Sequence, residues 1–134
     1  MRLPQAPPFR YVDRLVERGA DRSCVAIKRF SAGEEGEPPR SEVPFSRVLE
    51  ALCQAAALIP AQDGTGGRIL KIEDVQLSHP VQVGDTLTIR CALLEETDAA
   101  LRARSVGEVE GRVVAGLTVL VGRVPAEEGH GAAS

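Results

Sequence analysis

The sequence predicts an α+β fold in which one curled antiparallel sheet wraps around a single long buried helix. The helix is expected at Pro44–Ile59, because this stretch is rich in helix formers and is apolar around the whole helical circumference from Val48 onward. Four strand-like segments follow and are joined largely by tight turns, which is typical of antiparallel pairing. A single helix that is apolar all round can be buried only if the sheet curls around it.

The chain of 134 residues is long enough for about one domain with a real core. We expect that domain to span residues 1–124, and we expect the polar segment 125–134 (PAEEGHGAAS) to be a disordered tail. The net charge of −3 argues against nonspecific binding to nucleic acid. Residues 1–8 lack the apolar region of a signal peptide, and the predicted helix is too short to span a bilayer, so no membrane partner is expected.

The three cysteines are odd in number and do not have the spacing of metal ligands: Cys24, Cys53 and Cys91. We therefore expect free and mainly buried thiols, and neither a metal nor a cofactor. Free thiols are typical of a reducing compartment, so these residues favour a cytoplasmic protein.

Three segments precede the long helix. Residues Phe9–Arg18 are predicted to form a short amphipathic helix that ends at Gly19. Its apolar residues fall at helical spacing: Phe9, Val12, Leu15 and Val16. The segment Ser23–Phe30 contains β-branched residues and is predicted to be a strand. The polar segment Ser31–Glu42 carries four glutamates and indicates a loop that leads into the helix.

Prolines mark both ends of the long helix. Pro44 suits the first turn, where its missing N–H costs nothing, and Pro60 is expected to stop the helix.

The four strand-like segments after the helix differ in their apolar patterns. They are Ile69–Leu77, Asp85–Leu94, Ala99–Val109 and Arg112–Arg123. The first alternates with a slip near Asp74, as a β-bulge would produce. The second alternates regularly, which predicts a half-buried strand. In the fourth segment, the run Val113–Val121 is apolar on both faces apart from Thr118. Both faces of this strand must therefore be covered by other parts of the protein, and a partner subunit is one candidate for the second face.

Two polar residues interrupt the apolar helix. Glu50 and Gln54 are four residues apart and therefore lie on one face. A carboxylate on a buried helix is costly unless it is paired, hydrogen-bonded or neutralised. In one interpretation Glu50 lies near the helix start and points to water or meets the helix dipole. In the other, both residues line a pocket and Glu50 is a carboxyl suited to acid–base chemistry. The pattern leaves both interpretations open.

Several motifs resemble those of the bacterial 3-hydroxyacyl-acyl-carrier-protein dehydratases. Leu49–Ala56 (LEALCQAA) resembles the core-helix motif L-E-A-x-A-Q-A of that family, and Pro8–Arg14 (PFRYVDR) resembles its opening P-F-x-x-V-D-R. Leu77–Asp85 (LSHPVQVGD) is similar to its F-x-x-P-V-x-P-G-D, and Glu110-Gly111 occupies its later D-G hairpin. The matches run in order from about residue 4 to residue 122. The resemblance implies a hot-dog fold and a homodimer or higher oligomer, with acyl-thioester pockets at the subunit interface.

The resemblance also assigns roles to single residues. The family uses a histidine from a G-H-F-P loop as the base and the helix glutamate of the other subunit as the acid. Glu50 matches this catalytic glutamate, and Gln54 and Pro44 match the neighbouring glutamine and the proline that opens the helix. The histidine position corresponds to Gly36, in a loop without histidine, so we expect dehydratase activity to be weak or lost.

Three function classes follow. The first is a dehydratase-like protein that binds or acts on 3-hydroxyacyl or acyl thioesters of acyl-carrier protein or coenzyme A in fatty-acid or polyketide-type metabolism. A non-catalytic partner subunit of an active dehydratase is one form of this class. The second is an acyl thioesterase in which Glu50 activates water. The third is an active dehydratase with another base, for which Glu35 and Glu37 are the candidates in the loop. The resemblance over nearly the whole chain favours the first class.

Overall fold

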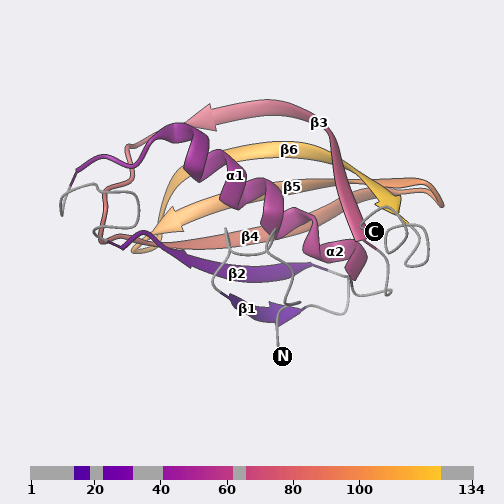
Figure 1. Ribbon diagram of the computed structural model, residues 1–134, viewed down its shortest axis with the longest axis horizontal. Coiled ribbons are helices and arrows are strands. Elements are labelled where there is room, and N and C mark those ends of the chain that lie inside the picture. Colours follow the sequence, from indigo (N-terminus) through magenta and orange to yellow (C-terminus); the bar gives the residue numbers. More distant parts are fainter. Residues whose placement is uncertain (1–13, 19–22, 32–40, 62–65, 125–134) are drawn as a thin grey trace, which may run out of the picture.

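The computed structural model describes residues 14–18, 23–31, 41–61 and 66–124. This part of the chain holds six strands and two helices (Figure 1). In chain order they are β1 (Arg14–Arg18), β2 (Cys24–Arg29), α1 (Phe45–Ala56), α2 (Leu58–Ala61), β3 (Gly66–Leu77), β4 (Thr86–Glu96), β5 (Ala100–Val109) and β6 (Arg112–Val124).

The strands form one antiparallel sheet in the order β1-β2-β4-β5-β6-β3. Helix α1 lies across one face of this curved sheet, which we call the inner face (Figure 1). Strands β1 and β3 are the two edges, and α2 packs against β3. The predicted α+β arrangement, a curled antiparallel sheet around one long helix, is therefore confirmed.

The core lies between α1 and the inner face. Every second residue of the central strands points to the helix and is almost fully buried, as in Leu87 and Ile89 of β4. Gly107 of β5 leaves no room for a side chain, because a Cβ at this position would lie 2.9 Å from Cδ1 of Leu87 on β4 and 3.2 Å from Cδ2 of Leu52 on α1. Burial of these aliphatic side chains is the main favourable contribution to the stability of the fold.

The helix differs from its prediction in two respects. It is not enclosed on every side, because Ser46 and Glu50 are exposed, whereas the side toward the sheet is buried. It also ends at Ala56 rather than at Pro60, which lies inside the short helix α2. Proline is tolerated there because the first residues of a helix need no N–H donor.

The prediction of a helix at Phe9–Arg18 is wrong for the described part. Residues Arg14–Arg18 form β1, which pairs with β2, while residues 9–13 lie outside the described residues. The pairing shifts register between Leu15 and Glu17. A bulge interrupts the two-residue alternation of a strand, and this explains why the apolar spacing resembled that of a helix.

The strands after the helix lie where the sequence predicted them. The expected slip near Asp74 is a register shift between Glu73 and Gln76, and Asp74 has a positive φ of 50°. Glu110 and Gly111, with φ of 52° and 79°, make the tight turn between β5 and β6. Both central residues of such a hairpin turn adopt positive φ, which explains the glycine.

Strand β6 is buried on both faces along most of its length, as predicted. On the outer face Thr118 is only 6% exposed. The guanidinium group of Arg104 lies over Gly116 and contacts Thr118. Part of the second cover therefore comes from the chain itself, and a partner subunit is not needed there.

Candidate functional site

Glu50 projects from the N-terminal half of α1 on the side away from the sheet. Its side chain is exposed and makes no hydrogen bond or ion pair with the part of the chain that the structure describes. Gln54 is half-buried one turn further on. In a single chain, then, Glu50 points to water, as the first interpretation expected, and the same exposure leaves its carboxylate free to meet a ligand or a partner.

Cys53 is the titratable group most affected by Glu50. Its side chain is 5% exposed. Burial, and to a smaller extent the negative charge of Glu50, raise the pKa of the Cys53 thiol from 9.0 to about 11. Cys53 is thus protonated at neutral pH, which excludes it as a nucleophile.

The other two thiols form a pair on the inner face. Cys24 and Cys91 lie opposite each other on β2 and β4. The contact with Cys24 and burial raise the pKa of Cys91 well above its ordinary value. All three cysteines are free and buried, as the sequence predicted.

Two cationic groups share one aromatic ring near the start of α1. The guanidinium carbon of Arg47 and the ammonium nitrogen of Lys28 each lie 5.6 Å from the centroid of the Phe30 ring. Arg47 precedes Glu50 by three residues, so the two side chains are neighbours on the helix surface. No sequence pattern pointed to Lys28, Phe30 and Arg47 as a group, because they meet only after β2 has docked beside the helix.

Pro44 directly precedes α1, and its carbonyl accepts a hydrogen bond from the N–H of Arg47 at 3.0 Å. The preceding segment is anchored by a hydrogen bond of 2.7 Å from the N–H of Val43 to the carbonyl of Val81. The segment that leads into α1 is therefore held in place by backbone hydrogen bonds. Gly36 and the loop carboxylates Glu35 and Glu37 lie outside the described residues.

His79 lies in the connection between β3 and β4, where it meets Arg112. Its Nδ1 is 3.0 Å from Nη2 of Arg112. Because a guanidinium group can only donate, Nδ1 accepts this hydrogen bond and the imidazole proton is on Nε2. His79 thus lies in the connection after β3 and contacts Arg112, whereas the position of the missing histidine precedes α1.

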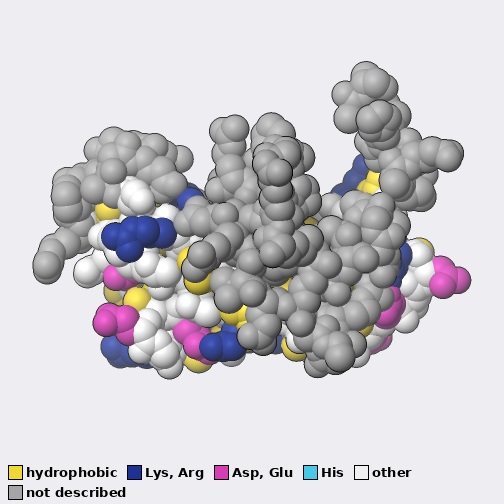
Figure 2. Space-filling model, turned by 90° about the horizontal axis from the view of Figure 1, so that it is seen from below, with side chains coloured by type: hydrophobic (Ala, Val, Ile, Leu, Met, Phe, Trp, Pro, Cys, Tyr) yellow, Lys and Arg dark blue, Asp and Glu magenta, His cyan; other side chains and the backbone are white. Residues whose placement is uncertain are grey.

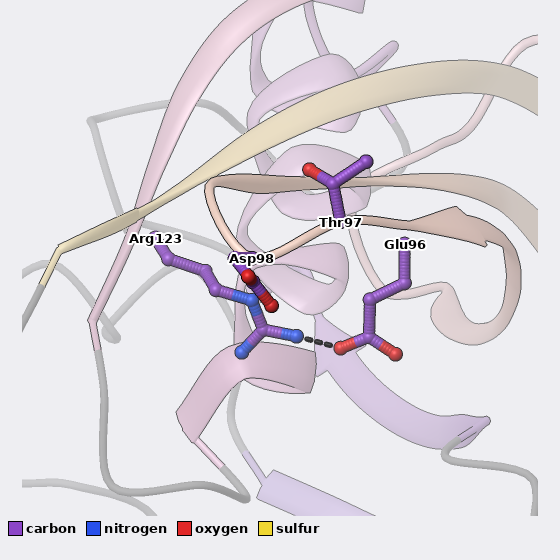
Figure 3. Close-up of a pocket in the computed structure, with 4 residues that line it drawn as sticks. All are labelled: Glu96, Thr97, Asp98 and Arg123. Atoms are coloured by element: carbon purple, nitrogen blue, oxygen red, sulfur yellow. Dashed lines mark ion pairs between the residues drawn. The ribbon is translucent and has the colours of Figure 1, made fainter.

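A polar hollow lies at the β4–β5 hairpin (Figure 3). Glu96, Thr97, Asp98 and Arg123 line it. The guanidinium group of Arg123 is ion-paired with Glu96, so the cation among the described lining residues is paired within the chain. This hollow contains none of the residues that the sequence singled out.

On the face seen in Figure 2, cationic and anionic side chains are interspersed over the described surface. Within the described ranges no cluster of three or more His, Cys, Asp or Glu side chains is placed to hold a metal ion. No helix in those ranges is long and apolar enough to cross a membrane.

Comparison with known proteins gives a consistent result. The chain is 36% identical over 124 residues to 3-hydroxyacyl-acyl-carrier-protein dehydratase FabZ of Anaeromyxobacter dehalogenans, covering 84% of this chain and 80% of the relative. It is 32% identical over 121 residues to the protein of the same name from Ruminiclostridium cellulolyticum, covering 84% and 85%. No model of a protein family matches the chain.

Solved structures agree on the fold. A hypothetical thioesterase from Streptococcus pneumoniae, solved with coenzyme A, has a TM-score of 0.70 at 13% identity, covering 84% of this chain and 85% of that one. At this identity the likeness concerns the fold alone. It confirms the predicted hot-dog fold.

Proposed function

Because the chain belongs to the family of bacterial 3-hydroxyacyl-acyl-carrier-protein dehydratases, we propose that it binds or acts on 3-hydroxyacyl or acyl thioesters of acyl-carrier protein or coenzyme A, with dehydratase activity that is weak or lost. The proposal rests on one observation. The helix motif of the family presents a free carboxylate at Glu50, whereas position 36, where the family places its histidine, is glycine.

The missing base explains why elimination should be slow. Dehydration of a 3-hydroxyacyl thioester needs a base that removes the α-proton and an acid that protonates the departing hydroxyl group. Glu50 supplies the acid in this proposal, and Gln54 and Pro44 shape the pocket beside it. Gly36 has no side chain to act as a base, and the Nδ1 of His79 is hydrogen-bonded to Arg112.

We further propose that the functional unit is a homodimer formed through the edge strand β3. Four of the six large apolar side chains that are exposed in the described part of the chain lie on this strand: Leu70, Ile72, Val75 and Leu77. Two copies of one strand edge can pair about a two-fold axis. A second copy would cover these side chains and bring a second surface close to the open side of α1. The free thiols support a cytoplasmic setting, and one domain over residues 1–124 remains part of the proposal.

A second candidate function is hydrolysis of the thioester. The carboxylate of Glu50 has no partner in the described part of the chain, and Gln54 lies one turn away on the same face. A free carboxylate can act as the base that activates a water molecule, and a neighbouring amide can orient that water. This reaction needs no histidine.

The test compares wild type, Glu50→Gln and an intact dehydratase relative on 3-hydroxyacyl and acyl thioesters. Loss of a positioned base typically costs about 10²–10⁴-fold in rate, so wild type should dehydrate at least about a hundredfold more slowly than the relative. Glu50→Gln should keep the fold, because glutamine preserves the size of an exposed side chain. Glu95→Gln is the matched control, since its side chain is 70% exposed on β4.

The outcomes separate the candidates. Dehydration within tenfold of the relative would contradict the proposal. Thioester hydrolysis that Glu50→Gln abolishes and Glu95→Gln preserves would favour the thioesterase. If Glu50→Gln changes neither turnover nor the binding of acyl thioesters, Glu50 has no role in the site.

A further inference from the structure

Strand β3 contains two irregularities that decide which side chains it presents on the inner face. The register with β6 shifts between Ile69 and Lys71 and again between Glu73 and Gln76. Ile69, Ile72 and Leu77 pair with Val121, Val119 and Ala115, all of which are buried on the inner face. These three β3 residues therefore point to the same side of the sheet.

Regular alternation would not give this result. Ile72 and Leu77 are five residues apart, and an odd separation places two residues on opposite faces of a regular strand. The extra residue between Glu73 and Gln76 restores both to the inner face. The apolar row of the edge strand thus depends on the bulge at Asp74 and Val75.

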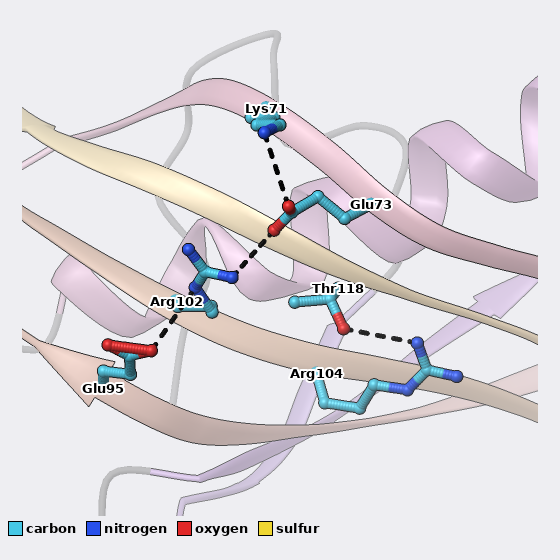
Figure 4. Close-up of polar contacts among 6 residues, drawn as sticks. All are labelled: Lys71, Glu73, Glu95, Arg102, Arg104 and Thr118. Atoms are coloured by element: carbon cyan, nitrogen blue, oxygen red, sulfur yellow. Dashed lines mark hydrogen bonds and ion pairs between the residues drawn. The ribbon is translucent and has the colours of Figure 1, made fainter.

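Arg104 of β5 holds this bulge from the outer face. Its Nη1 donates a hydrogen bond of 3.1 Å to the carbonyl oxygen of Asp74. The same atom lies 3.4 Å from Oγ1 of Thr118 (Figure 4). Asp74 is the residue with φ of 50°, so the contact is made at the irregular point of the strand. Because β5 does not pair with β3, the side chain crosses the whole width of β6 to make this bond.

Gly116 makes the crossing possible. It lies on the outer face of β6 beneath the guanidinium group, and a Cβ at this position would lie 2.8 Å from Nη2 of Arg104. Arg102 makes a parallel link, because its Nη1 is 2.9 Å from Oε1 of Glu73 (Figure 4). Arg102 reaches a side chain, whereas Arg104 reaches the backbone of the bulge. Only Arg104 can fix the local strand geometry directly.

We propose that Arg104 is a positioning residue that locks the bulge of β3 and thereby sets the apolar row through which a second copy of this chain binds. This inference rests on the homodimer of the proposed function and names the residue that controls it. If the bulge is lost, Leu77 turns to the outer face and the row is broken. A hydrogen bond from a charged donor to a carbonyl is strong enough to bias that choice.

The experiment compares the self-association of wild type, Arg104→Met and Arg90→Met by sedimentation velocity over a range of concentrations. Methionine keeps much of the apolar stem and removes the donors. Arg90→Met is the matched control, because Arg90 is 58% exposed and its ion pair with Glu108 at 3.3 Å joins neighbouring strands away from β3. Arg104→Met should weaken dimerisation by about tenfold or more, and Arg90→Met should leave it unchanged.

A second variant and a second readout keep the inference testable if Arg104→Met folds poorly. Gly116→Ala displaces the guanidinium group without removing it, and it should weaken dimerisation in the same direction. In both variants, hydrogen exchange of peptides covering residues 73–77 should be faster than in wild type. Circular dichroism checks that the fold is retained.

The failures can be told apart. A wild-type protein that is monomeric at all concentrations contradicts the homodimer, and with it this inference. In the other case wild type is a dimer, and Arg104→Met and Gly116→Ala weaken it no more than Arg90→Met does. That result contradicts the role of Arg104 alone.

Discussion

Glu50 and Cys53 illustrate how one exposed residue changes a buried neighbour. Both lie on α1, and the carboxylate adds to the effect of burial in raising the pKa of the thiol to about 11. The folded protein therefore holds the thiol proton more tightly than the unfolded chain does. Between the two pKa values, the unfolded chain loses its proton first, which makes unfolding easier as the pH rises.

We expect the free energy of unfolding of wild type to fall as the pH rises from about 9 to about 11, with a smaller fall in Cys53→Ala. The contribution of Cys53 is fully present below pH 9.0 and is lost through this window. Urea unfolding at several pH values measures both slopes. Glu50→Gln removes the smaller cause, so its slope should lie between the two. Equal slopes for wild type and Cys53→Ala would contradict this account.

Some site residues could be predicted from the sequence and others could not. Glu50 and Gln54 were recognised because polar residues stand out on an apolar helix, and their shared face follows from helix geometry. Whether Glu50 is exposed depends on what packs around α1, and the helix pattern does not contain that information. Arg104 gave no signal, because its contact with Asp74 depends on the register of two strand pairs.

At the scale of elements, regular patterns were predictable and irregular ones were not. Strand β4 was recognised from its strict alternation, and the hairpin at Glu110-Gly111 from its turn chemistry. Strand β1 was mistaken for a helix because its bulge breaks the alternation. The bulge in β3 was detected because this strand is long. Its apolar alternation can be followed on both sides of Asp74, and the two parts are out of phase.

The close approach of α1 to β5 gives a prediction at this scale. Gly107→Ala should lower the free energy of unfolding by about 1–3 kcal/mol, because the added methyl group meets Cδ1 of Leu87 at 2.9 Å. The added methyl group should be less harmful in a Leu87→Ala background, where there is room for it. Denaturant unfolding of the two single variants and the double variant measures this coupling. Additive effects would contradict the contact.

The whole molecule is a sheet with one covered face and two different edges. Charged side chains on the outer face are paired within the chain. Arg90 binds Glu108, while Arg102 and Arg104 reach across β6 to Glu73 and to the carbonyl oxygen of Asp74. On the inner face α1 covers the central strands, whereas Ile72 and Leu77 of β3 remain 39% and 46% exposed. An edge strand with free backbone groups and exposed apolar side chains can pair with a second copy, and this supports β3 as the interface of the proposed homodimer.

We therefore expect Leu77→Glu to dissociate the dimer, with the dissociation constant raised at least about tenfold, because a carboxylate would enter an apolar interface beside its symmetry mate. Leu94→Glu is the matched control: Leu94 is 53% exposed on β4 and Leu77 is 46% exposed, so both substitutions place a charge at a similarly open site. Neither should change the stability of the single chain by more than about 0.5 kcal/mol. Light scattering and thioester binding measured on the same samples would show whether site and dimer are lost together. If the Leu77→Glu protein remains dimeric, β3 is excluded as the dimer interface.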